Sequence, residues 1–232
     1  MFIAPVNNIN NINPAAKELV FGHGHKNNSN YSSGQKAIIT GMSILGVLAG
    51  AAVAAKFKGY SLKPSKMFSN IKNSYFLKSD FKAEEVVTMG AGSILGGLAA
   101  GYIVDKDTHN RRAKKREALM QIGNVAIPIF TVDLLVDKTL KNSSKWAKAI
   151  GGASGIVIGV TLANIIMNKV NNWIFNENNA RNVKFTDYSV HLDDAVVAAN
   201  YISKSKVVKA IGRLVPAALV IPGLEVGKKT VN

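Results

Sequence analysis

The stretch AIGGASGIVIGVTLANIIMN, residues 149–168, runs for 20 residues without a charged side chain and carries small residues at every helical turn. Residues 37–55, AIITGMSILGVLAGAAVAA, and residues 86–104, VVTMGAGSILGGLAAGYIV, have the same character. About 20 apolar residues make a helix long enough to cross a hydrocarbon layer roughly 30 Å thick. A helix at the surface of a soluble protein presents a polar face, and these blocks have no charged face. They therefore predict three membrane-spanning helices.

Two further apolar segments are less uniform. Residues 118–136 are long enough to span a membrane but contain several polar side chains and a proline. Residues 207–226 hold an uninterrupted apolar core of only 11 residues, LVPAALVIPGL, which is short for a span. We predict a fourth span at 118–136 and an interfacial or re-entrant segment at 207–226. The fold class that follows is all-α: a polytopic helical membrane protein with about four transmembrane helices and a short C-terminal hydrophobic segment.

Composition separates an N-terminal arm from this membrane domain. Residues 1–36 begin MFIAPVNNINNINP and are rich in asparagine and poor in apolar surface. Such a segment does not offset its loss of chain entropy by burial, so we predict a disordered arm at 1–36 and a helical membrane domain at 37–232. The chain has no cysteine, which excludes disulfides and cysteine-ligated metal centres. We predict no cofactor, metal site or catalytic residue.

The chain carries 29 Lys and Arg residues against 14 Asp and Glu residues, a net charge of +15. Such a charge is typical of nucleic-acid-binding proteins, but these cations lie between the apolar blocks. Juxtamembrane cations attract anionic lipid headgroups. We therefore predict that the partner is a lipid bilayer, with anionic headgroups at the basic segments, and that nucleic acid is not bound.

Counting cations also orients the four predicted spans. With the N-terminus inside, the cytoplasmic segments hold 18 Lys and Arg residues and the outer segments hold 11. The densest cluster, in the predicted loop DKDTHNRRAKKRE at 105–117, then lies inside as well. The positive-inside rule thus predicts a multi-pass protein with both termini in the cytoplasm. If 207–226 were a fifth span, the cytoplasmic segments would hold 14 Lys and Arg residues and the outer segments 13, so the rule would favour neither orientation.

Glycines recur at every fourth position in the three uncharged blocks, and residues four apart lie on one face of a helix. A ridge without side chains lets two backbones approach closely, which favours helix association in lipid. In water each such glycine costs a helix about 1 kcal/mol relative to alanine. The pattern predicts glycine zippers, within one chain or between copies in a homo-oligomer. The predicted helix-packing residues are Gly46, Gly50, Gly92, Gly96, Gly97, Gly101, Gly151, Gly155 and Gly159.

The first two blocks also resemble each other. The heptads at 43–49 (SILGVLA) and 93–99 (SILGGLA) are identical at 6 of 7 positions and lie 50 residues apart. In consecutive spans such copies run antiparallel, as the inverted repeats of transporters do. Independent convergence on one small-residue pattern is the alternative explanation.

Few residues have the chemistry of a functional site. Gln121 and Asn124 lie one turn apart in 118–136, and Asp133 follows near the end of that segment. An ionisable group inside a membrane is costly and usually functional, so these three residues form a candidate polar path. Hydrogen bonding to neighbouring helices is the alternative role.

A denser polar cluster, His191, Asp193 and Asp194, opens the stretch HLDDAVVAANYISK. A histidine with carboxylates has the groups for metal binding or proton transfer. Acids at the start of a helix also favour its positive end, which explains them without any site. We therefore treat this cluster as a weak candidate.

Three functions stay open. The first is a structural or scaffolding membrane protein that assembles through small-residue helix packing, and the second is a small transporter or channel with a path near Asp133. The third is a dinucleotide-binding enzyme, because residues 86–97 are similar to a strand that enters a glycine-rich turn. That motif needs a second strand ending in an acid after about 20 residues, where this chain has RRAKKRE. We predict the structural role, which requires only the features above, and we predict no enzymatic activity.

Overall fold

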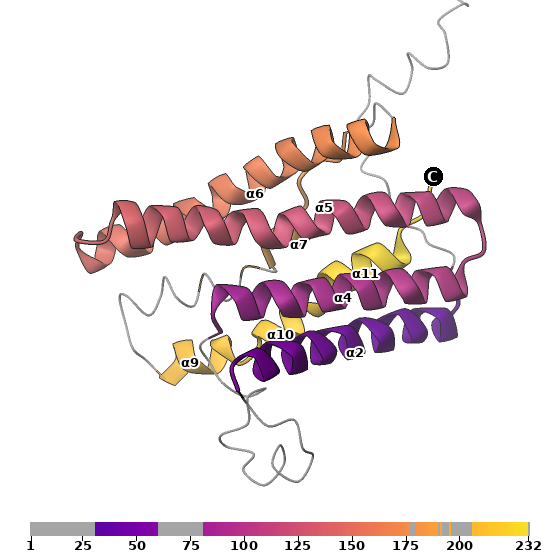
Figure 1. Cartoon of the computed structure of the whole chain (residues 1–232), viewed down its shortest axis with the longest axis horizontal. Helices are drawn as coiled ribbons and strands as arrows, with labels where there is room; N and C mark the ends of the chain where they lie inside the picture. Colours follow the sequence, from indigo (N-terminus) through magenta and orange to yellow (C-terminus); the bar gives the residue numbers. More distant parts are fainter. Residues whose placement is uncertain are drawn as a thin grey trace, which may run out of the picture.

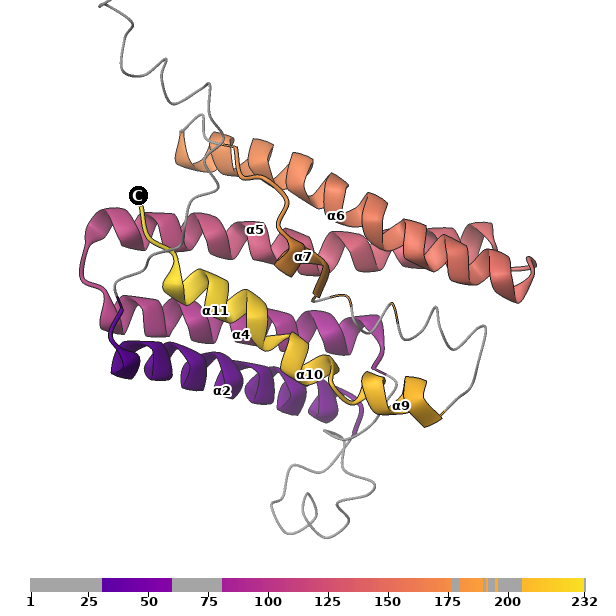
Figure 2. The ribbon, with the colours of Figure 1, turned by 180° about the vertical axis from the view of Figure 1, so that it is seen from behind.

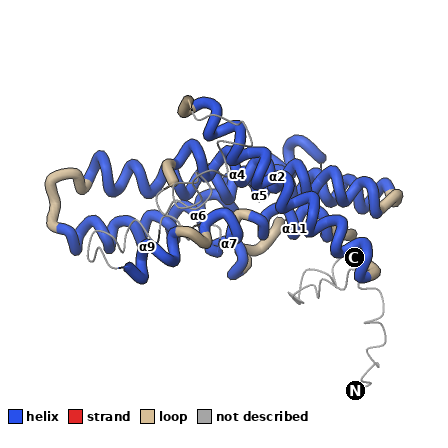
Figure 3. The backbone as a smooth tube through the Cα atoms, turned by 90° about the horizontal axis from the view of Figure 1, so that it is seen from below, coloured by secondary structure: helices blue, strands red, loops and turns tan. Residues whose placement is uncertain are grey.

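The computed structural model describes residues 31–59, 81–176, 180–189, 191, 195 and 206–231. Every regular element in these ranges is a helix, which confirms the predicted all-α class, and Figure 3 shows that helix makes up most of the described chain. The elements are α2 (Ser33–Phe57), α4 (Ala83–Val104), α5 (Thr108–Asp133), the π-helical turn η3 (Leu134–Thr139), α6 (Lys145–Phe175), α7 (Phe185–Ser189), α9 (Lys206–Gly212), α10 (Val215–Ala218) and α11 (Val220–Lys228).

The long helices lie side by side in two groups (Figure 1). α2 packs against α4, and α11 packs against both of them. α5 packs against α6 in the second group, and contacts of α5 with α4 and α11 join the two groups. The molecule is therefore a bundle in which α4 and α5, joined by a short turn, form the centre.

Among the described residues, five helical segments are long and apolar enough to cross a membrane: Ser33–Phe57, Ala83–Val104, Thr108–Thr139, Lys145–Phe175 and Ala210–Lys228. The first four contain the four spans that the sequence predicted. The fifth covers most of the segment at 207–226 that the sequence predicted to be interfacial or re-entrant.

Local sequence explains where the long helices begin and end. Ser32 starts α2 with a capping box, in which Ser32 Oγ accepts from Gln35 N at 3.3 Å and Gln35 Oε1 accepts from Ser32 N at 2.9 Å. Asp107 and Ser144 cap α5 and α6 by accepting a hydrogen bond from the backbone three residues on. α6 ends at Asn176, which has the left-handed conformation common at helix ends, with φ of 49°.

The basic stretch at 105–117 is mostly helical, whereas the sequence predicted a loop. Only residues 105–107 connect α4 to α5. Residues 108–122 include no glycine or proline and hold three Arg, two Lys and two Ala residues, which favour helix. Five of the six cations in this stretch therefore lie on one helix and point in different directions.

α10 and α11 run along α2 and α4 (Figure 2). Turns at Arg213–Leu214 and at Leu219 separate α9, α10 and α11, and the chain keeps its general direction through them. The length estimate from the sequence counted only 11 uncharged residues, but the helical path continues past them through Glu225 to Lys228. The structure thus provides a fifth candidate span here.

Helices α2 and α4 approach so closely that glycines of one helix meet backbone atoms of the other. A Cβ atom on Gly46 would overlap the carbonyl oxygen of Gly92, and a Cβ atom on Gly50 would overlap that of Thr88. Because these positions lack side chains, dispersion contacts form directly between the two backbones.

The two similar heptads occupy equivalent places in this interface. A Cβ atom on Gly46 of the first copy would meet the carbonyl oxygen of Gly92, and a Cβ atom on Gly96 of the second would meet that of Met42. In both cases the oxygen belongs to the residue four positions before the other copy's glycine. An approximate two-fold rotation therefore relates the two copies, as expected for antiparallel packing.

α11 lies where the serines of both copies meet. A Cβ atom on Gly223 would lie 2.5 Å from Ser93 Oγ and 2.7 Å from Ser43 Oγ. The amide of Gly223 also donates a hydrogen bond of 3.2 Å to Ser93 Oγ. On the same side, a Cβ atom on Gly97 would overlap the carbonyl oxygen of Gly223. A third backbone thus packs on the α2–α4 pair.

The glycines of α6 face α5 and the turn that follows it. The atoms nearest to a Cβ atom on Gly151, Gly155 and Gly159 belong to Leu140, Val132 and Pro128 in turn. The Gly155 Cβ atom would lie 3.0 Å from Val132 Cα. α5 continues through Pro128, and Gly159 leaves room for the backbone at that proline.

The outside of the bundle is more apolar than that of a soluble protein. Large exposed apolar side chains cover the long helices, including Ile38, Leu45, Leu48, Leu95, Ile103, Phe130, Ile150, Val157, Ile165 and Ile166. The interior combines an apolar core with charged and amide side chains, including Glu85, Lys114, Glu117, Gln121, Asn124 and Asp187. This distribution is expected where hydrocarbon surrounds the helices and polar groups turn inward.

The first prediction uses two glycines of α2 that differ in their surroundings. Gly46→Ala places a methyl group against the Gly92 backbone, whereas no described atom lies within 4 Å of a Cβ atom on Gly41. We expect Gly46→Ala to lower the free energy of unfolding in detergent by about 1–3 kcal/mol, as overpacking does. The control, Gly41→Ala, should leave it unchanged or raise it by up to about 1 kcal/mol. Equal melting temperatures for the two variants would contradict close packing at Gly46.

Candidate functional site

After α6 the chain turns back into the bundle and places a short polar segment beside α5. Arg181 lies next to Glu117 of α5, and His191 lies next to Asn124 of the same helix. Seven residues of a helix span about 10 Å, so this segment follows α5 toward the middle of its length. Between residues 180 and 189, which the structure describes, the regular element is α7, with 5 residues.

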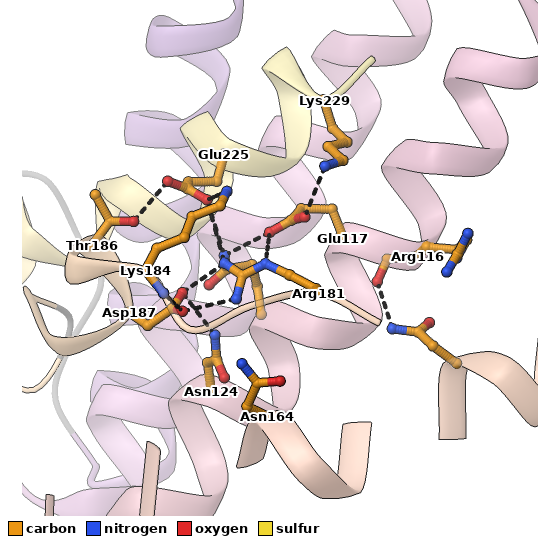
Figure 4. A network of polar contacts seen from close by, with 12 residues as sticks. Arg116, Glu117, Asn124, Asn164, Arg181, Lys184, Thr186, Asp187, Glu225 and Lys229 are labelled. Atoms are coloured by element: carbon orange, nitrogen blue, oxygen red, sulfur yellow. Dashed lines mark hydrogen bonds and ion pairs between the residues drawn. The ribbon is translucent and has the colours of Figure 1, made fainter. Parts of the chain in front are cut away.

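Arg181 is the centre of a buried network of ion pairs (Figure 4). Its two terminal nitrogens donate to the two carboxylate oxygens of Asp187 at 2.8 and 2.7 Å, a bidentate pair. Nε lies 3.1 Å from Glu117 Oε1 on α5, and NH2 lies 3.5 Å from Glu225 Oε2 on α11. One guanidinium thus joins the polar segment to both helix groups.

The network is balanced in charge. Lys184 Nζ lies 2.7 Å from Glu225 Oε2, and Thr186 Oγ1 donates to Glu225 Oε1 at 2.8 Å. Lys229 Nζ lies 3.8 Å from Glu117 Oε2. Three carboxylates therefore face three cations, an arrangement that lowers the cost of charge in a low-dielectric interior.

Amide and imidazole groups complete the network. Asn124 Nδ2 donates to Asp187 Oδ1 at 2.9 Å, and Gln121 Nε2 donates to Glu117 Oε1 at 2.9 Å. His191 Nε2 lies 2.8 Å from the carbonyl oxygen of Asn124 and so donates to it. The structure thus brings together Gln121, Asn124 and His191, which the sequence had assigned to two separate features.

Asp133 does not belong to this network. It is exposed and lies nine residues beyond Asn124, which is two and a half helical turns and hence the opposite face of α5. Gln121, Asn124 and Asp133 therefore do not line one path. Asp193 and Asp194 lie outside the described residues.

Sequence reasoning missed all six charged residues of the network. Arg181 and Asp187 lie in a long polar stretch with no periodic pattern, and Glu117 precedes the predicted span at 118–136. Glu225 gave the one available signal, because it is the only acidic residue in the apolar segment at 207–226. An acid in such a segment needs a buried partner.

The network holds an irregular segment against the bundle, with Asp187 buried and Val183 and Phe185 exposed. Backbone groups away from water need partners, and an irregular segment does not supply its own. Asn168 of α6 accepts from Arg181 N at 2.8 Å and donates to Arg181 O at 2.9 Å. Burial opposes the charge of Arg181, but Asp187, Glu117 and Glu225 outweigh it and raise the pKa of the guanidinium above its ordinary value. Arg181 therefore stays charged and fixed.

A second buried cluster ties both described ends of the chain to the α4–α5 turn. Lys114, which is fully buried, lies 3.0 Å from Asp105 Oδ2 and donates to the Tyr31 hydroxyl at 2.7 Å. Tyr31 in turn donates to Asp105 Oδ2 at 2.7 Å. Gly101 makes room for this lysine, since a Cβ atom there would lie 2.8 Å from Lys114 Cδ. Lys114 also donates to the carbonyl oxygen of Lys229.

This cluster shifts the pKa values of two groups, Asp105 and Tyr31, that lie outside the candidate spans. Burial raises the pKa of the Asp105 carboxyl, but hydrogen bonds from Tyr31 and Lys114 outweigh burial and hold that pKa below its ordinary value. Burial, followed by the hydrogen bond to Asp105, raises the pKa of the Tyr31 hydroxyl. Both shifts favour a charged carboxylate that accepts from a neutral phenol.

Two other chemistries find no support in the described residues. Residues 86–97 lie inside α4, so the strand that a dinucleotide-binding turn requires is not formed there. No group of three His, Cys, Asp or Glu side chains in the described part of the chain has the arrangement of a metal site.

Comparison with known protein families, curated proteins and solved structures finds no match for this chain. Its class therefore follows from its own structure. In the part of the chain that the structure describes, it is all-helical, with five helices long and apolar enough to span a membrane.

The second prediction compares a buried with an exposed aspartate. Asp187→Asn removes the bidentate partner of Arg181 and leaves a buried guanidinium with less compensation. We expect a loss of about 3–5 kcal/mol in the free energy of unfolding, measured by denaturant titration in detergent. Asp133→Asn makes the same chemical change at an exposed site and should alter stability by less than about 0.5 kcal/mol. Similar losses in both variants would refute the network's role.

The third prediction concerns the stability of the fold at low pH. Since the fold lowers the pKa of Asp105, the stabilisation that its carboxylate provides is complete above its unfolded pKa of about 4. It is lost as the pH falls through the lower pKa of the folded state. Melting temperatures in detergent between pH 2 and 7 should fall on acidification more steeply for the wild type than for Asp105→Asn. Parallel curves would show that Asp105 is not coupled to folding.

Proposed function

We propose that this chain is a structural or scaffolding integral membrane protein, a multi-pass bundle that glycine zippers hold together. The observation that carries the proposal is the apolar outer surface of the long helices together with the charged groups that are buried between them. Large apolar side chains cover the outside of the five candidate spans, and a charge-balanced network lies inside. Water does not favour such a surface over this length, whereas acyl chains do.

The glycine contacts support assembly within a single chain. Gly46 and Gly92 bring α2 and α4 together, and Gly155 with Gly159 packs α6 on α5. Bare backbone at these contacts provides close packing that lipid does not otherwise favour. Because these ridges are occupied within the bundle, any contact between copies must use other surfaces.

The tryptophans of α6 agree with a span of bilayer thickness. Trp146 is 64% exposed and Trp173 is 83% exposed, near opposite ends of the helix. Their spacing of 27 residues corresponds to about 40 Å along a helix, close to the full bilayer with its headgroup regions. Tryptophan favours these interfacial levels.

We further propose that the end of the bundle holding the α4–α5 turn faces the cytoplasm. The basic residues of 105–117 lie there, as do both described ends of the chain, since Tyr31 bonds to Asp105 and Val231 bonds to Asn110. The positive-inside rule favours the cytoplasm for such a cluster.

The fourth prediction uses the absence of cysteine in the wild type. Lys106→Cys and Lys141→Cys introduce single thiols at exposed positions near opposite ends of the bundle. In intact cells we expect a membrane-impermeant maleimide to label Lys141→Cys, and to label Lys106→Cys only after permeabilisation. Both variants should stay in the membrane pellet after carbonate extraction.

The cysteine-free parent is the control and should take up no label. Labelling of Lys106→Cys alone in intact cells would reverse the proposed orientation. Release of the chain into the carbonate supernatant would overturn membrane integration itself.

A further inference from the structure

A row of polar side chains runs along one face of α5. Glu117, Gln121 and Asn124 are spaced by four and three residues, so they lie on the same face of the helix. All three are buried. Acyl chains offer no hydrogen bonds to such groups, so a spanning helix with this face needs a cover that brings polar partners.

The polar segment, residues 180–189 and 191, brings these partners. Arg181 pairs with Glu117, Asp187 accepts a hydrogen bond from Asn124, and His191 donates to the carbonyl oxygen of Asn124. The segment therefore turns polar groups toward α5 along the length of this face.

The same segment lies between two candidate spans. On one side, Asn168 of α6 bonds both backbone groups of Arg181. On the other side, Thr186 donates to Glu225 of α11. Figure 2 shows α7 in front of α5, between α6 and α11. The segment thus completes the outer surface of the bundle between these two helices.

The side that the segment turns away from the bundle is apolar. Phe185 is 87% exposed and Val183 is 39% exposed. Lys184 and Thr186, which alternate with them in the chain, both contact Glu225. A loop in water is expected to place its polar side chains outward and its phenylalanine inward. This alternation is the opposite and suits a segment with protein on one side and hydrocarbon on the other.

The level of the segment in the bundle agrees with that environment. Trp173 is 83% exposed and suits the headgroup level of a membrane. Arg181 is bonded to Asn168, which lies five residues before Trp173, or about 8 Å further along α6. From there the segment continues toward the middle of α5. Interfacial segments bury their apolar side chains about 5–10 Å into the boundary between headgroups and acyl chains.

We propose that the polar segment is a re-entrant cover at the membrane interface, in which Phe185 and Val183 contact the acyl chains of the bilayer. The inference rests on the proposed function, because it requires a bilayer around α6 and α11. It assigns to the membrane a stretch that lies outside all of the spans predicted from the sequence. The polar face of α5 then meets protein at this level and is shielded from lipid.

The fifth prediction is tested with single nitroxide labels on the full-length chain, which has no cysteine of its own, in phosphatidylcholine vesicles. Phe185→Cys carries the label at the proposed lipid contact. Val157→Cys, at a 54% exposed position near the middle of α6, is the membrane reference. Lys106→Cys, at an exposed position in the α4–α5 turn, is the aqueous reference. Electron paramagnetic resonance measures the collision rates of each label with oxygen and with a water-soluble nickel chelate.

Oxygen concentrates in acyl chains, whereas the nickel chelate stays in water. We therefore expect the ratio of the oxygen to the nickel collision rate to rise from Lys106→Cys through Phe185→Cys to Val157→Cys. The ratio at Phe185→Cys should correspond to a depth of about 5–10 Å below the headgroups. Val183→Cys labels the same side of the segment and should give the same result, so the test does not depend on one variant.

A ratio at Phe185→Cys and Val183→Cys equal to that of Lys106→Cys would place the segment in water and overturn the inference. Low collision rates with both reagents would show that other parts of the protein cover these residues, and would overturn it as well. The label at Val157→Cys separates the two proposals. If that label is in acyl chains while the segment is in water, only this inference fails, whereas an aqueous ratio at Val157→Cys contradicts the proposed function.

Discussion

Two helices in hydrocarbon gain little from hiding apolar side chains from each other, so their association depends on how closely their backbones approach. In this protein that approach occurs at Gly46 and Gly92, where α2 and α4 meet without intervening side chains. The other contacts follow from it. The antiparallel pair brings Ser43 and Ser93 to one place, and α11 packs there through Gly223. A side chain at the first contact would move all three helices apart.

Hydrocarbon also requires that polar groups find partners within the protein. The segment after α6 packs against the bundle as irregular chain, and those of its backbone and charged groups that are buried there need partners within the protein. Asn168 bonds both backbone groups of Arg181, and Arg181 joins Asp187, Glu117 and Glu225. The network therefore anchors this segment between the two helix groups. Its charges explain why Glu225 is compatible with an otherwise apolar helix.

The basic stretch at the start of α5 serves two roles because it is a helix. Lys114 points inward and is fully buried against Asp105 and Tyr31, where Gly101 leaves space for it. Arg112 and Lys115 are exposed and line a cavity beside the end of α6. Residues that are adjacent in the chain thus hold the bundle end together on one face and present positive charge on another.

The all-α class and four of the five candidate spans were evident from the sequence, because a run of about 20 apolar residues is a local property that any length of chain displays. The spaced glycines of α2, α4 and α6 were visible for the same reason, since a period of four needs only one helix to appear. Gly223 of α11 was not predicted. Tertiary structure decided three other features: the partners of these glycines, the burial of the Lys114 side chain and the network around Arg181. Each depends on residues far apart in the chain, such as Arg181, Glu117 and Glu225, that meet only after the helices pack. Asp133 shows the limit of local reasoning. It lies on the opposite face of α5 from Asn124 and is exposed, but the sequence alone does not show which face of this helix packs against the polar segment.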